Sequence, residues 1–238
     1  MADSAEPGRG ERALENLLQF ISDPQFDEQA AITLLARRDL PADIIEKLAR
    51  RPEFPESYAV LRALAFHVNV PRVTAKKVCR KLHLMDTVKL SVAPALSPDI
   101  QRIAEDELLF RLPRLALGQM IAVARQASAR VLAALILEGN AKTVGPALDN
   151  PRFSEAQVLK ILSSERLPAP VVPTIARHTR WPKLPNVRTA LLRHPQTPYE
   201  IALRLLRQAS LNELRTLLRS TSLTAEFRRQ VERAASQR

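Results

Sequence analysis

The chain has 238 residues, a formal net charge of +11, five glycines and a single cysteine, Cys79. This length suits one large domain or one continuous repeat array, and a lone cysteine excludes an internal disulfide. The purest apolar run, residues 131–137, is too short to span a bilayer, and residues 1–10 lack the apolar stretch of a signal peptide. We therefore expect a cytoplasmic protein with no membrane role.

The helical composition and apolar periodicity predict an all-α protein. We expect residues 1–10 to be disordered and residues 11–238 to form one continuous array. Helices are predicted over residues 11–21, 55–66, 74–84, 115–124, 129–137, 154–162, 185–192 and 224–235. Further helices are expected to start at Asp27, Pro41, Ser97, Thr197 and Ser210, together with a short one from Pro168 to about Arg177. Asp27 is expected to cap a helix, and Gly139-Asn140 is typical of a helix end. Thr197 with Glu200, and Ser210 with Glu213, have the spacing of capping boxes.

A short device recurs along the chain and is clearest at Asn150-Pro151-Arg152-Phe153-Ser154. The proline ends the preceding helix, the apolar residue two positions later anchors the turn, and Ser154 is expected to cap the next helix. A helix of ten to fourteen residues with its turn takes roughly 20 residues, so two predict a hairpin repeat of about 40. The pattern predicts a two-layer α-solenoid of about seven HEAT-like helical hairpins, in which stacking supplies the core. The alternative is that proline merely punctuates an ordinary all-α protein.

The segments 150–154 and 186–198, the second ending His194-Pro195-Gln196-Thr197-Pro198, resemble bacterial HEAT-like and leucine-rich-repeat-variant proteins. In that family, Asn or His followed by Pro opens each helical unit. The resemblance is best over residues 140–235, and the spacing between Pro168 and Pro195 departs from a strict repeat. It implies a right-handed α-solenoid with a binding role and carries over no catalytic residues.

The charge is distributed unevenly along the chain. Residues 151–238 carry 16 Lys and Arg against six Asp and Glu, whereas residues 1–150 carry 20 against 19. The basic part contains the candidate binding patch around the single tryptophan, which consists of Arg177, His178, Arg180, Trp181, Lys183, Arg188, Arg193, His194, Arg204 and Arg207. Such cations can hold a phosphate backbone while the Trp181 ring stacks on a base. Alternatively, Trp181 fills a gap between hairpins, and the arginines complement the dipoles of helix C-termini.

Motifs for catalysis or metal binding are weak. Cys79 and His83 lie four apart, but no second cysteine completes a zinc site. The three consecutive carboxylates at 105–107 point about 100° apart on a helix, so they do not converge as a general acid and base. We therefore expect no enzyme, no cofactor, no metal and no small-molecule substrate. The favoured function is a scaffold or adaptor that binds a protein partner on its concave surface, and the alternative is nucleic-acid binding by the basic patch.

Overall fold

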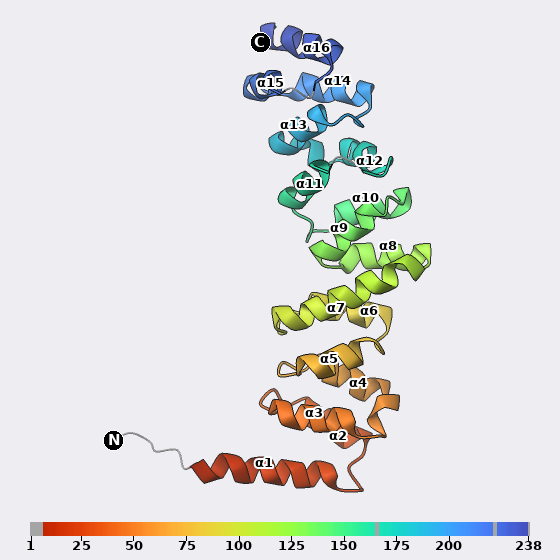
Figure 1. The fold of residues 1–238 in the computed structure, drawn as a ribbon, viewed down its shortest axis with the longest axis vertical. Coiled ribbons are helices and arrows are strands. Elements are labelled where there is room, and N and C mark those ends of the chain that lie inside the picture. The colour runs from red at the N-terminus through yellow and green to blue at the C-terminus, as the bar shows by residue number, and fades with distance from the viewer. Residues whose placement is uncertain (1–6, 165–166, 221–222, 238) are drawn as a thin grey trace, which may run out of the picture. The chain divides into compact units, whose positions relative to one another are not determined.

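The computed structural model describes residues 7–164, 167–220 and 223–237 (Figure 1). Within these ranges the protein is all-helical, with sixteen α-helices, three short 3-10 turns and no strands. Of the expected disordered N-terminus, residues 1–6 lie outside the described residues. The first helix begins at Pro7, four residues before the expected start at residue 11.

The chain divides into two compact units, which we describe separately: unit 1 ends at Phe110 and unit 2 begins at Arg111. The helices of unit 1 are α1 (Pro7–Ser22), α2 (Glu28–Leu35), α3 (Ala42–Arg50), α4 (Tyr58–Ala65), α5 (Arg72–Cys79), α6 (Leu84–Ser91) and α7 (Pro98–Arg111), the last of which ends one residue into unit 2. A 3-10 turn, Phe54–Glu56, precedes α4. The sequence pattern predicted longer helices between Asp86 and Leu112; α7 has fourteen residues, but α6 has only eight.

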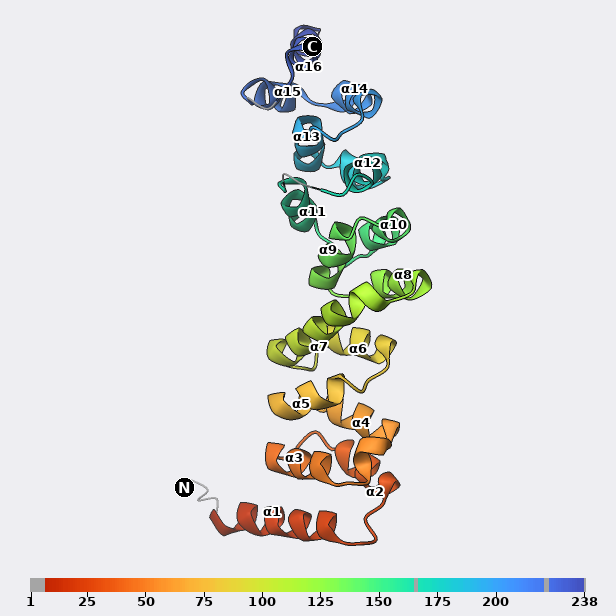
Figure 2. The same cartoon turned by 45° about the vertical axis from the view of Figure 1, so that its right-hand side comes forward.

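Unit 2 opens with the 3-10 turn Leu112–Arg114, and a second 3-10 turn, Trp181–Lys183, precedes its sixth helix. Its helices are α8 (Leu117–Gln126), α9 (Ala129–Leu137), α10 (Ala141–Asp149), α11 (Glu155–Leu162), α12 (Val171–Arg177), α13 (Pro185–Arg193), α14 (Tyr199–Gln208), α15 (Leu211–Leu218) and α16 (Ala225–Ser236). Helix α10 was not predicted. Alternate helices pack on each other: α10 contacts α8 and α12, while α11 contacts α9 and α13, and α13 contacts α15 (Figure 2).

Several of the predicted helix ends are confirmed. Asp27 accepts a hydrogen bond of 2.8 Å from the Ala30 N–H, and Gly139 ends α9 with a φ of 75°. The capping box of α15 is complete, because Glu213 accepts from the Ser210 N–H at 2.7 Å and donates its own N–H to the Ser210 hydroxyl at 3.3 Å. These ends depend only on neighbours in sequence, which explains why the sequence predicts them.

The predicted capping box at Thr197 is wrong. Pro198 is the N-cap of α14, and the Thr197 hydroxyl donates instead to the Leu191 carbonyl at 2.6 Å, within the preceding helix. At the α11 start, the backbone N–H of Ser154 donates to Gln157 Oε1 at 2.6 Å. Ser154 is therefore the N-cap of α11, as predicted, and the Gln157 side chain at the third helical position accepts a hydrogen bond from its backbone N–H.

The apolar residue two positions after the proline is buried in some turns, as the recurring device predicted, but not in all. It is buried at Phe26, Phe54, Leu96 and Phe153, whereas Val73 is 61% exposed and Leu115 and Leu184 are half-buried. In several other turns the buried residue comes directly before the proline, as at Leu40, Val70, Leu167 and Trp181. Burial of a side chain of this size contributes about 1.5–3 kcal/mol.

A polar residue at the end of each of four helices, α4, α10, α12 and α13, ties its turn to an earlier one. Asn150 accepts from the Arg152 N–H at 2.9 Å and donates to the Ala124 carbonyl at 2.9 Å, 26 residues earlier. Other residues make an equivalent pair of bonds to turns 29 or 30 residues earlier: His67 with Asn69 and Arg37, His178 with Arg180 and Asp149, and His194 with Gln196 and Ser164. Histidine and asparagine both offer an acceptor and a donor, so either can serve.

These bonds correct the repeat length that the proline spacing suggested. Equivalent turns are 26 to 30 residues apart, rather than about 40. The reason is that helices such as α2, α4, α11 and α15 have only eight residues, below the ten to fourteen that we assumed.

Candidate functional site

One set of turns in unit 2 is linked into a continuous line, which we call the corner row. It comprises residues 124–128, 148–154, 177–184 and 204–210, and each segment ends one helix and leads into the next. Asn150 bonds to the first turn, and the Trp181 indole N–H donates to the Leu148 carbonyl at 3.1 Å. Arg188 donates to the Pro182 carbonyl of the third turn and to Glu213 in α15. The Glu213 carboxylate in turn accepts from the Ser210 N–H of the fourth turn, so the pair links the two turns.

Trp181 belongs to the third turn of the row, but its side chain is buried and cannot stack on a base, contrary to one of our two interpretations. Its side chain is 0% exposed, it meets Phe153 edge to face at 6.2 Å between ring centroids, and its N–H is bonded. The guanidinium of Arg180 lies over the ring, 4.2 Å from its centroid. The ring therefore fills the space between hairpins and orients a cation above it.

The prediction that Arg188 belongs to an exposed binding patch is also wrong, because this residue is only 9% exposed. Its Nε donates to Glu213 Oε1 at 2.8 Å and its Nη2 donates to Oε2 at 2.9 Å, a bidentate pair joining α13 to α15. Burial by itself raises the pKa of Glu213, but hydrogen bonds from Arg188 and Ser210 outweigh it and hold that pKa below its ordinary value. A sequence signal existed: Arg188 shares a helix face with Leu191 and Leu192, which are buried.

Two further patch residues lie at the other end of α13, away from the corner row. Arg193 donates to the Thr216 carbonyl at 2.9 Å. His194 is 9% exposed and accepts from the Gln196 N–H at 3.2 Å. Burial lowers the pKa of His194, and its bond to the Ser164 backbone opposes this only in part. Neither residue therefore belongs to the corner row.

The remaining predicted residues gather on the corner row. Arg177, Arg180 and Lys183 are exposed in its third turn, and Arg204 and Arg207 are exposed toward the end of α14. His178 is half-buried there and contacts the Asp149 carboxylate at 3.0 Å. The sequence reasoning missed two exposed members of the row, Arg125 and Arg152. Arg152 follows Asn150 by two positions as Arg180 follows His178, so the repeat pattern itself carried this signal.

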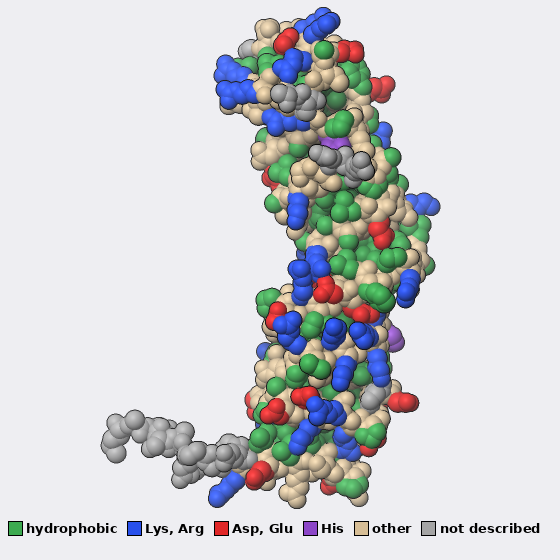
Figure 3. Space-filling model, in the orientation of Figure 1, with side chains coloured by type: hydrophobic (Ala, Val, Ile, Leu, Met, Phe, Trp, Pro, Cys, Tyr) green, Lys and Arg blue, Asp and Glu red, His purple; other side chains and the backbone are tan. Residues whose placement is uncertain are grey.

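The corner row is strongly cationic. Its four segments contain seven Lys and Arg, all exposed, and one acidic residue, Asp149. More broadly, the described residues of 151–237 include eleven exposed Lys or Arg and three exposed Asp or Glu. On the face drawn in Figure 3, the Lys and Arg side chains of unit 2 gather over α15 and α16. Those of unit 1 are interspersed with Asp and Glu on that face.

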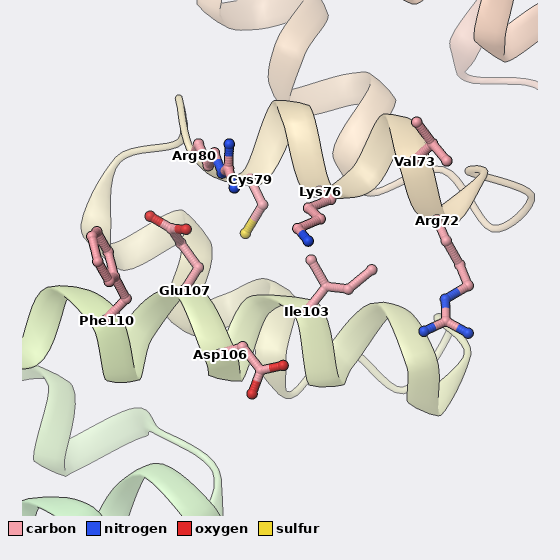
Figure 4. A pocket seen from close by; sticks show the side chains of 9 residues that line it. All are labelled: Arg72, Val73, Lys76, Cys79, Arg80, Ile103, Asp106, Glu107 and Phe110. Carbon is pink, nitrogen blue, oxygen red and sulfur yellow. The ribbon is translucent and has the colours of Figure 1, made fainter.

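Unit 1 has a groove of a different character, between α5 and α7 (Figure 4). Its cavity volume is about 780 Å³, and its lining residues are Arg72, Val73, Lys76, Cys79, Arg80, Ile103, Asp106, Glu107 and Phe110. Val73 is 61% exposed and Phe110 is 63% exposed, unusually high fractions for large apolar side chains. Lys76 and Ile103 face each other from the two helices.

Within the described ranges, no group of three His, Cys, Asp or Glu side chains is placed to hold a metal ion. No helix of the described chain has both the length and the apolarity needed to cross a membrane. No protein-family profile, curated protein or solved structure matches the sequence.

Proposed function

We propose that this chain is a non-catalytic helical-repeat protein that binds nucleic acid, with the corner row holding the phosphate backbone. The observation that carries the proposal is the row's composition of seven exposed cations and one carboxylate. Cations that neutralise phosphates release condensed counterions, which is the main source of affinity for a nucleic acid. For this reason we favour nucleic acid as the ligand over the protein partner that the sequence analysis favoured.

The proposed scaffold is a two-layer α-solenoid of HEAT-like hairpins within each unit. Its support is the contact between alternate helices and the bonds between turns 26 to 30 residues apart. In such a stack, adjacent helix axes are about 8–10 Å apart, so cations at equivalent turns recur at about that interval. Arg152 and Arg180 stand at equivalent positions, two residues after the C-caps of α10 and α12, and Arg125 lies in the preceding turn of the row, two residues before the C-cap of α8.

The test replaces these three arginines with glutamine and measures binding of labelled nucleic acid by fluorescence anisotropy across a salt series. If each one neutralises one phosphate, the slope of log K against log salt becomes shallower by about 2.7. The matched control replaces Lys142, Lys160 and Arg219, which are exposed at the opposite ends of α10, α11 and α15. Both variants lose three charges, so equal losses of affinity would show that net charge, not the corner row, is responsible. No binding by the unmodified protein at low salt would refute the proposal.

A protein partner is the second candidate, and the groove between α5 and α7 favours it. Phe110 and Val73 offer apolar contact beside charged side chains, the combination that protein interfaces use. If this groove is the docking site, Phe110→Ser abolishes co-purification of the partner. The control Phe20→Ser, on α1 and 52% exposed, leaves it intact. If the partner still co-purifies with the Phe110→Ser variant, it does not bind in this groove.

A further inference from the structure

The charged side chains that the corner row can offer a ligand are almost all cationic. Seven are guanidinium or ammonium groups and one, Asp149, is a carboxylate. The row offers no aromatic ring, because the aromatic residues Phe153 and Trp181 are both fully buried. The exposed large apolar side chains among the described residues of unit 2 are Leu137 and Tyr199. These lie at the end of α9 and the start of α14, the ends of those helices that face away from the row.

This arrangement distinguishes between forms of nucleic acid. Proteins that bind single strands without sequence preference rely on aromatic side chains on which successive bases stack, worth about 1–3 kcal/mol per base. The corner row has no such platform among its described residues. A ligand here is held through its phosphates, and Arg, Lys, Ser, Thr and Asn side chains are the usual donors to phosphate oxygens.

Two of the cations, Arg152 and Arg180, are held in place before a ligand arrives. Arg180 is stacked over Trp181, and the guanidinium of Arg152 donates to the Gln126 carbonyl at 3.4 Å. Each of their turns is bonded to the turn before it. A rigid row of charges matches a rigid partner best, because neither side then loses much conformational entropy on binding. Duplex DNA is stiff over about 150 base pairs, and it presents one phosphate per ~1.7 Å of its axis.

We infer that the ligand of the corner row is double-stranded nucleic acid, gripped along its phosphate backbone without recognition of its bases. This inference rests on the proposed function and narrows it to one class of ligand. Arg152, Arg180 and Lys183 lie between α-helices, and Arg125 and Arg177 lie in the last turns of α8 and α12. These five cations therefore do not line a single helix that could enter a major groove lengthwise and read base edges. Binding is therefore independent of sequence.

The magnitude follows from counterion release. With five contacts, from Arg125, Arg152, Arg177, Arg180 and Lys183, the expected slope of log K against log salt is about −4.5 for a duplex and about −3.5 for a single strand. If the two ligands bind equally at 1 M salt, the difference of one in slope corresponds to about tenfold tighter binding of the duplex at 0.1 M salt. Trp181 supplies a second readout, because a ring that no base reaches keeps its fluorescence when a ligand binds.

The experiment compares one 30-nucleotide sequence as a single strand and as a duplex, together with a scrambled duplex of equal composition, using the full chain. The expected result is about tenfold preference for the duplex, equal affinity for the two duplexes and unquenched Trp181 emission. Equal or tighter binding of the single strand, or a tenfold difference between the duplexes, overturns the inference while leaving the proposed function in place. Failure of every nucleic acid to bind refutes both.

A competition arm tests an acidic protein segment as the occupant. Polyglutamate and unlabelled duplex are each titrated against the bound labelled duplex, at equal concentrations of negative charge. The expected result is that polyglutamate displaces the label far less effectively, because its flexible chain must be ordered along the row. Equal displacement overturns the inference in favour of an acidic polypeptide.

Discussion

Replacing Glu213 with leucine removes the only carboxylate that faces the buried Arg188 guanidinium among the described residues. Arg188 keeps two weaker acceptors, the Pro182 and Lys183 carbonyls at 3.3 and 3.4 Å. Both members of the pair are less than 10% exposed, so water does not replace the lost partner. Breaking a buried ion pair from one side typically costs about 3–5 kcal/mol, because the other charge stays buried without compensation.

Urea unfolding followed by Trp181 fluorescence measures the loss of unfolding free energy close to the substituted pair. The indole lies in the turn whose carbonyls bond to Arg188, so its emission reports the unfolding of that turn. With a denaturant slope of about 2 kcal/mol per molar, Glu213→Leu lowers the midpoint by roughly 1.5–2.5 M.

The double variant Arg188→Met/Glu213→Leu separates a buried charge from a lost contact. Replacing both partners with apolar groups removes the uncompensated charge, so the double variant is expected to be more stable than Glu213→Leu alone. A loss of less than about 1 kcal/mol in the single variant, or a double variant as unstable as the single one, would refute this account of the pair.

Three further variants test the turns of unit 2. His194→Asn is expected to make the urea midpoint fall less steeply below pH 6.5. Burial lowers the pKa of His194 in the folded protein. Its contribution to the free energy of unfolding is therefore complete above the unfolded pKa of about 6.5, and is lost as the pH falls toward the folded pKa. A decline as steep as in the unmodified chain would show that another group titrates. Asn150→Ala is expected to lower the free energy of unfolding in urea by about 2–3 kcal/mol, because two hydrogen bonds are lost and the buried Ala124 carbonyl is left unpaired. A loss below about 0.5 kcal/mol, the range of ordinary surface substitutions, would contradict this. Gly139→Ala lowers the melting temperature, since its φ is 75° and a new Cβ would lie 2.1 Å from Pro168 Cβ. The control Gly145→Ala meets nothing within 4 Å and is expected to be neutral or stabilising, so equal losses in the two variants would refute the steric reason.

The fold was predictable where a structural signal is local. Asp27 and Ser210 cap the helices that follow them, and Gly139 takes the left-handed conformation that the sequence suggested. The repeat length was not predictable from proline spacing alone, because it depends on which turns meet in space. The bonds made by Asn150 and His178 define those meetings, and their partners are 26 and 29 residues away.

The candidate site was predictable only as a region. Clustering in sequence groups Trp181 and Arg188 with exposed cations, although both side chains are buried. The amphipathic period of α13 could have removed Arg188, as could the buried leucines beside it. Arg125 was missed because it lies 52 residues before Arg177, and only the stacking of the turns brings them into one row.

Asn150 and His67 each bond to a main-chain carbonyl of an earlier turn. A main-chain carbonyl is present whatever side chain occupies the position, so substitutions at Ala124 or Arg37 leave these bonds available. The side chains of the earlier turn can therefore vary without loss of its bond to the later one.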